Sequence, residues 1–123
     1  MLGNSDAMAT IAVKDLENAR KFYEEKIGLK RGENQQGVLT FKSGKSTIVI
    51  YVSQYAGTNK ATVATWAVPD AEAEVASLKS KGVTFEHYDL PGLTRKGDLH
   101  VAGSFKGAWF KDPDGNILHI LSQ

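Results

Sequence analysis

The sequence contains an internal repeat, and this repeat limits the possible folds more than any other feature. Residues 8–15 read Met-Ala-Thr-Ile-Ala-Val-Lys-Asp, and residues 63–70 read Val-Ala-Thr-Trp-Ala-Val-Pro-Asp. In each copy a segment with strand-like alternation leads to an aspartate and then to an apolar pattern of helical spacing. A repeat of this kind indicates one supersecondary unit used twice. We therefore predict two similar modules, 8–56 and 61–121, with a ligand cleft between them.

Each module is predicted to have the order βαβββ. Asp15 and Asp70 are suitable N-caps, while Gly28 and Gly82 are suitable residues to end the two helices. The strands of the first module are expected at residues 8–14, 29–31, 37–42 and 47–52. Those of the second are expected at residues 63–68, 83–88, 108–111 and 117–121. The Gly- and Pro-containing segment 89–103 is predicted to be one long loop.

Composition excludes several classes of function. The chain has 123 residues, a formal net charge of +1 and no cysteine. This length fits a single domain, and the dispersed Lys and Arg residues do not form the basic patch of a nucleic-acid-binding protein. Without cysteine there is no disulfide, thiolate metal site or Cys nucleophile. No segment is typical of a signal peptide or a membrane span, so we expect a cytoplasmic protein.

Strand alternation assigns side chains to two faces of each sheet. One face should lie under the helices, and we place Ile11, Val13, Trp66, Val68 and Phe110 there. The other face should be open and line the cleft. The residues expected on this open face are Met8, Thr10, Ala12, Val63, Thr65, Ala67, Trp109, Lys111 and His119. Phe22 and Tyr23, at helical spacing, are expected in the core.

Several motifs together resemble a known superfamily. They are the strand-to-helix join in each module, the sequence Phe22-Tyr23 followed by Ile27-Gly28-Leu29, and the turn Asp112-Pro113-Asp114-Gly115-Asn116. This pattern over residues 8–121 resembles the glyoxalase, bleomycin-resistance and extradiol-dioxygenase (vicinal oxygen chelate) superfamily. The resemblance implies an α+β fold in which two tandem βαβββ modules form an incomplete, barrel-like cleft. It also implies a homodimer.

The resemblance bears on metal binding as well. The metal-ligand positions of metal-dependent members fall here on Met8, Val63 and His119, with a fourth near Ile48 to Ile50. Among these side chains His119 alone is a good ligand for a divalent metal. We therefore expect no metal cofactor, although a divalent metal in an unorthodox site remains the alternative. A relocated metal site that joins His119 to His87 and His100 is a further alternative. We instead expect His87 and His100 to be solvated surface groups.

Two classes of function follow from this reading. The first is a metal-free protein that binds a small, partly apolar or aromatic molecule in the cleft, as bleomycin-resistance proteins sequester a drug. Tyr55, Tyr88 and Asp89 are expected to border that cleft. The second is a lyase, isomerase or dioxygenase-type enzyme in which His119 acts as acid, base or metal ligand. A non-catalytic dimerisation module is a third possibility.

Overall fold

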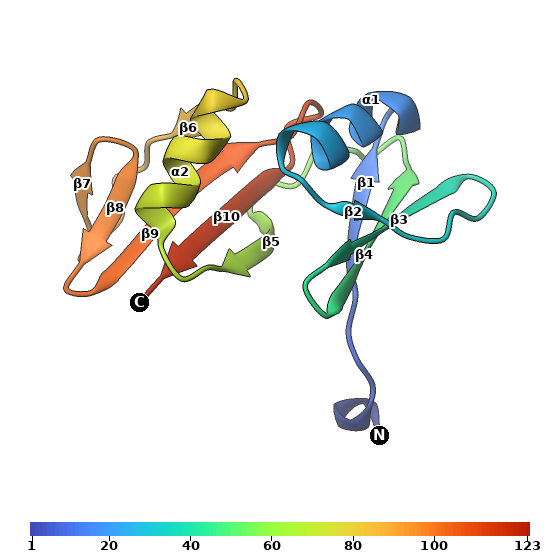
Figure 1. Ribbon diagram of the computed structural model, residues 1–123, viewed down its shortest axis with the longest axis horizontal. Coiled ribbons are helices and arrows are strands. Elements are labelled where there is room, and N and C mark those ends of the chain that lie inside the picture. Colours follow the sequence, from blue (N-terminus) through green and yellow to red (C-terminus); the bar gives the residue numbers. More distant parts are fainter.

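Two β-sheets, each with one helix packed on one face, make up the computed structural model, which describes residues 1–123 (Figure 1). The first module comprises β1 (Ala9–Val13), α1 (Leu16–Arg20), β2 (Lys30–Arg31), β3 (Val38–Ser43) and β4 (Ser46–Val52). Its sheet has the order β1-β4-β3-β2, in which β1 is parallel to β4 and the other pairs are antiparallel. A short 3-10 helix, η1 (Leu2–Asn4), precedes β1.

The second module repeats this plan with two additional strands, β7 (Thr94–Lys96) and β8 (Leu99–Ala102). Its other elements are β5 (Thr62–Ala67), α2 (Ala71–Ser80), β6 (Phe85–Glu86), β9 (Phe105–Lys111) and β10 (Ile117–Ser122). The sheet order is β5-β10-β9-β8-β7, and β6 also pairs with β9. The predicted α+β fold of two βαβββ-type modules is confirmed. Neither helix is long and apolar enough to cross a membrane.

The segment predicted as one long loop is partly ordered as a hairpin, so this prediction was wrong. Strands β7 and β8 pair within residues 89–103, and β8 continues through a turn into β9. Gly97 and Gly103 adopt φ values of 63° and 58°, which glycine reaches without steric cost. The glycines that suggested irregular structure are therefore the turns of two hairpins.

Both predicted helix starts are confirmed. The side chain of Asp15 accepts a hydrogen bond from the Asn18 N–H (2.9 Å), and that of Asp70 accepts one from the Ala73 N–H (3.1 Å). The first helix nevertheless departs from a regular α-helix after Arg20, where it continues as a π-helical turn, η2 (Lys21–Lys26).

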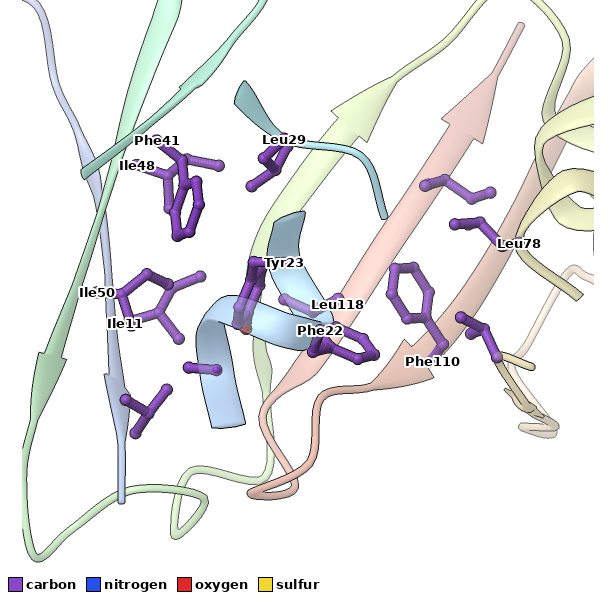
Figure 2. Packing of buried hydrophobic residues seen from close by; sticks show 14 of the residues in the cluster. Ile11, Phe22, Tyr23, Leu29, Phe41, Ile48, Ile50, Leu78, Phe110 and Leu118 are labelled. Carbon is purple, nitrogen blue, oxygen red and sulfur yellow. The ribbon is translucent and has the colours of Figure 1, made fainter. Parts of the chain in front are cut away.

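The π-helical turn shapes the core. The neighbouring side chains of Phe22 and Tyr23 are both buried, and their rings meet edge to face with centroids 5.1 Å apart. Figure 2 shows the two rings between side chains of the two sheets, with Ile11 and Ile50 on one side and Phe110 on the other. A single cluster of 17 buried apolar residues draws on both modules. The helix-bearing faces of the two sheets thus share one core.

This shared core determines where the opposite faces point. Because both sheets turn their helix side toward Phe22 and Tyr23, their open faces are directed away from the core in each module (Figures 1 and 2). Strands β1 and β5 contact each other, but neither the pocket beside Met8 nor the pocket beside Trp109 joins the predicted cleft residues of the two modules. Met8 borders a pocket formed by residues 6–8, 43 and 45–47, which belong to the first module and the segment just before it.

A buried polar network joins the β9–β10 turn to the first module. The Asp112 carboxylate accepts hydrogen bonds from the Tyr23 hydroxyl (2.7 Å) and from the Asn116 side-chain amide (2.8 Å). The same amide donates to the carbonyl of Ala12 (2.7 Å). Asp112 also accepts from the backbone N–H groups of Asp114 and Asn116 (2.9 Å each). The Asp-Pro-Asp-Gly-Asn motif therefore holds the two modules together.

Candidate binding site

The open face of the second sheet carries a stack of two side chains, Trp109 on β9 and His119 on β10. These residues are directly opposite in the antiparallel register, which places their side chains on the same face. Their rings are nearly parallel, with an angle of 9° and a centroid separation of 4.1 Å. Thr65 on β5 lies opposite His119, and its hydroxyl oxygen is 3.3 Å from His119 Nδ1. Three of the predicted cleft residues are thus in contact.

Two further rings make roughly perpendicular contacts with Trp109. His100 lies at a centroid distance of 4.8 Å and an angle of 90°, and Tyr88 lies at 5.7 Å and 73°. Edge-to-face contacts of this kind are favourable because the positive ring edge meets the negative ring face. We call Tyr88, His100, Trp109 and His119 the aromatic cluster. Trp109 faces away from the core while Phe110 is buried in it, as the alternation of the strand predicts.

A β-bulge in β5 changes the placement of Val63, which is one of the predicted cleft residues. Ile117 pairs with Thr62 whereas Leu118 pairs with Ala64, so Val63 is an extra residue in β5. Val63 packs against the hydrophobic core instead of extending the open face. The bulge brings Thr62 to the face of the aromatic cluster, where its hydroxyl accepts a hydrogen bond from Trp109 Nε1 (3.1 Å). Sequence alternation missed Thr62 because a bulge shifts the period of two by one residue.

His100 is buried, with 1% exposure, and the expectation of a solvated surface histidine was wrong. Its Nε2 accepts a hydrogen bond from the Tyr88 N–H (3.0 Å), and its Nδ1 lies 3.4 Å from the carbonyl oxygen of Gly107. This pattern requires a neutral imidazole with the proton on Nδ1. His87 is half exposed, and its Nε2 lies 2.8 Å from Asp98. The three histidines do not converge on one point.

His119 is held in a neutral form. Burial lowers the pKa of His119 below its ordinary value. Nε2 of His119 is buried without a hydrogen-bond partner. A Cβ atom on Gly107 would lie 2.9 Å from this nitrogen, so glycine at position 107 makes room for the stacked imidazole.

The remaining predicted residues lie apart from the stack. Met8 and Thr10 are exposed on the first module, and Met8 lies outside β1 with 57% exposure. Lys111 is on the open face of β9, where its Nζ lies 3.4 Å from Glu86 Oε1. Tyr55 is exposed in the segment that joins the modules.

The side chains at the superfamily's metal-ligand positions do not fit a divalent metal. Met8 lies on the first module, Val63 packs against the core, and Ile48 and Ile50 are buried apolar residues. His119 is therefore the one nitrogen donor among them. No group of three or more His, Cys, Asp or Glu side chains in residues 1–123 is arranged to hold a metal ion. We derive no chemistry through a metal for this chain.

A pocket of about 380 Å³ adjoins the aromatic cluster. It is lined by Lys60, Ala61, Thr62, Tyr88, Leu90, Trp109 and Ile117. Its volume is at the lower end of the range of small-molecule pockets, about 300–1,000 Å³. A second cavity, of about 270 Å³, lies on the helix side between the modules, where Trp66 Nε1 donates to the Ser43 hydroxyl (2.8 Å). The two tryptophans thus border different cavities.

Comparison with known proteins agrees with the fold and the motifs. Residues 7–120 match the model of the family described as the Glyoxalase/Bleomycin resistance protein/Dioxygenase superfamily. No curated protein matches the sequence.

Solved structures with the same fold have low sequence identity to this chain. A glyoxalase/bleomycin resistance protein/dioxygenase from Alicyclobacillus acidocaldarius has a TM-score of 0.72 at 19% identity, covering 97% of this chain and 91% of that one. TnmS3, an antibiotic binding protein from Streptomyces sp. CB03234, has a TM-score of 0.68 at 21% identity, covering 94% and 92%. An integron cassette protein from the mobile metagenome of Halifax Harbour has a TM-score of 0.70 at 20% identity, covering 94% and 96%.

Proposed function

Because the chain belongs to the glyoxalase/bleomycin resistance protein/dioxygenase superfamily, we propose that it binds a small, partly apolar or aromatic molecule on the open face of the second sheet. The aromatic cluster and the pocket beside it are the observation that carries this proposal. Five of the seven lining residues are hydrophobic, and Trp109 provides an aromatic wall. The structural likeness to an antibiotic binding protein is consistent with such a role.

Contacts with three aromatic rings hold Trp109 in position. His119 covers a face of the indole, while the rings of His100 and Tyr88 lie roughly perpendicular to it. The hydrogen bond from its Nε1 to Thr62 fixes the orientation of the ring. Because such a ring loses little freedom when a ligand stacks on it, the arrangement lowers the entropic cost of binding.

Fluorescence of single-tryptophan variants can test this proposal. Trp66→Phe leaves Trp109 as the one emitter, and Trp109→Phe leaves Trp66 on the helix side. Small planar aromatic compounds should quench the fluorescence of the Trp66→Phe variant in a saturable manner. The same compounds should quench the Trp109→Phe variant weakly or without saturation. Binding that is unchanged by substitution of both Trp109 and His119 would contradict the proposal.

A homodimer is the second part of the proposal. In one chain no residue of the first module lines the pocket beside Trp109. Met8 and Tyr51, which are 57% and 38% exposed, are apolar groups on the first module that a second copy would cover. We expect sedimentation velocity at micromolar concentration to give twice the mass of the chain. A monomer at that concentration, with ligand binding intact, would exclude the dimer and retain the binding function.

An enzymatic role is the second candidate function, and the unpartnered Nε2 of His119 favours it. A neutral imidazole can accept a proton from a substrate that reaches this nitrogen. Turnover of hemithioacetals or catechols that is lost in His119→Gln would support catalysis. The absence of turnover, together with elemental analysis that finds no stoichiometric metal in the purified protein, would remove this candidate.

A further inference from the structure

The polar side chains of the pocket beside Trp109 offer hydrogen-bond donors and include no carboxylate. Among its seven lining residues, Lys60, Thr62, Tyr88 and Trp109 have polar groups, and the Tyr88 hydroxyl is buried without a hydrogen-bond partner. The Thr62 hydroxyl accepts the hydrogen bond from Trp109 Nε1 and retains its own hydrogen to donate to a ligand. The Lys60 ammonium is a donor only. Lys60, Thr62 and Tyr88 can therefore each donate a hydrogen bond, and no carboxylate lines the pocket.

Charges near the pocket leave Lys60 uncompensated. Lys60 takes part in none of the ion pairs of the chain, which use Arg20, Arg31, His87 and other lysines. Lys111, next to Ile117 on the same face, has Glu86 as its partner at 3.4 Å. Asp89 lies between two lining residues in sequence but does not itself line the pocket. The net charge that faces the pocket is thus positive.

We infer that the ligand of this site is a small aromatic anion, such as an aromatic carboxylate, sulfonate or phenolate, whose charge is recognised by Lys60. Its ring would stack in the apolar part of the pocket, between Trp109 and Leu90, and its anionic group would meet the ammonium of Lys60 and the hydroxyl of Thr62. This inference rests on the proposed binding function and adds the charge of the ligand to it.

The expected contribution of Lys60 is modest because the residue is exposed. Ion pairs between exposed groups are weakened by water and by the cost of ordering a long side chain. Removal of the Lys60 charge should therefore weaken binding of an anion about threefold to fivefold. Salt should have a similar effect, since the Debye length falls to a few ångströms near 1 M ionic strength.

Two probes with the same ring system provide the test. 8-Anilinonaphthalene-1-sulfonate is an anion, and N-phenyl-1-naphthylamine is its uncharged counterpart. Dissociation constants for both are measured with the wild type, Lys60→Gln, Trp109→Leu and the control Lys81→Gln, which changes an exposed lysine outside the pocket. Circular dichroism confirms that each variant is folded. Quenching of Trp109 fluorescence in the Trp66→Phe variant gives a second measurement of probe binding, and the residues of the site are unaltered in this variant.

The inference predicts that Lys60→Gln weakens binding of the sulfonate about threefold to fivefold and leaves binding of the amine unchanged. The Lys81→Gln control should bind both probes like the wild type. Sodium chloride at about 0.5 M should weaken the sulfonate selectively. If Trp109→Leu weakens binding of both probes but Lys60→Gln changes the binding of neither, the inferred negative charge of the ligand is refuted and the proposed binding function stands. If Trp109→Leu changes neither probe, or neither probe binds saturably, the proposed function fails and this inference fails with it.

Discussion

Tyr23→Phe isolates one hydrogen bond of the network that joins the two modules. The Tyr23 hydroxyl donates to the Asp112 carboxylate at 2.7 Å, and both residues are buried. Phenylalanine retains the ring, and with it the contacts to Phe22 and Phe41. The substitution therefore removes the hydroxyl without opening a large cavity in the core.

The cost of this substitution can be estimated from the charge of the acceptor. Hydrogen bonds to charged groups contribute about 1.5–3 kcal/mol to stability. Asp112 keeps three other donors, from Asn116 and Asp114, so its carboxylate is not left unpartnered. We expect a loss of about 2 kcal/mol in the free energy of unfolding. For a chain of this size, that loss lowers Tm by roughly 5 to 10 °C.

Urea unfolding followed by circular dichroism measures this loss, with Tyr55→Phe as the control because Tyr55 is 68% exposed. The control should change stability by less than about 0.5 kcal/mol. Burial, followed by the charge of Asp112, raises the pKa of Tyr23 far above its ordinary value. The contribution of Tyr23 is thus complete below about pH 10 and is lost as the pH rises above it. A Tyr23→Phe variant as stable as the Tyr55→Phe control would refute this account of the network.

Three further predictions concern the backbone, the site and a helix cap. Gly57→Ala should destabilise the protein by roughly 3 kcal/mol or more, because Gly57 has φ 74° and a Cβ would collide with the Asp114 carbonyl oxygen. Gly37→Ala, at φ 77° in open space, should cost only about 1–2 kcal/mol, and equal urea midpoints for the two variants would contradict this. Because the pKa of His119 is lowered in the fold, its contribution to stability is complete above about pH 6.5 and is lost as the pH falls; NMR titration should find the imidazole pKa below that value. Asp70→Ala should cost about 1 kcal/mol through loss of the cap on α2, whereas Asp6→Ala, ahead of β1, should leave thermal stability unchanged.

Local patterns predicted most of the fold. The repeat indicated two modules, and the two aspartate caps are where the sequence placed them. These features depend on neighbours a few residues apart, so they can be read from the chain directly. The prediction failed at segment 89–103, where Gly97 and Gly103 form hairpin turns. Glycine at a positive φ serves both hairpins and irregular loops, and composition alone does not distinguish them.

The candidate site was predicted in part. Alternation correctly directed Trp109 away from the core and placed Thr65, Trp109 and His119 on one face. It missed Thr62 because the bulge at Val63 changes the register of β5, and the position of a bulge depends on the partner strand. It also missed the buried role of His100, whose two nitrogens find backbone partners at Tyr88 and Gly107 only after the hairpin has folded.

The sequence by itself determined the repeated βαβββ unit, the helix caps, and the loss of ligand character at Met8 and Val63, because each is a property of residue type and local spacing. Only the tertiary structure decided how the two modules are arranged. The π-helical turn places Phe22 and Tyr23 between the sheets, and Asp112 ties that turn to the second module. Both helix faces therefore point into one core, and the open faces point outward. This arrangement results from contacts between residues as far apart as Tyr23 and Asp112, which no local pattern in the chain specifies.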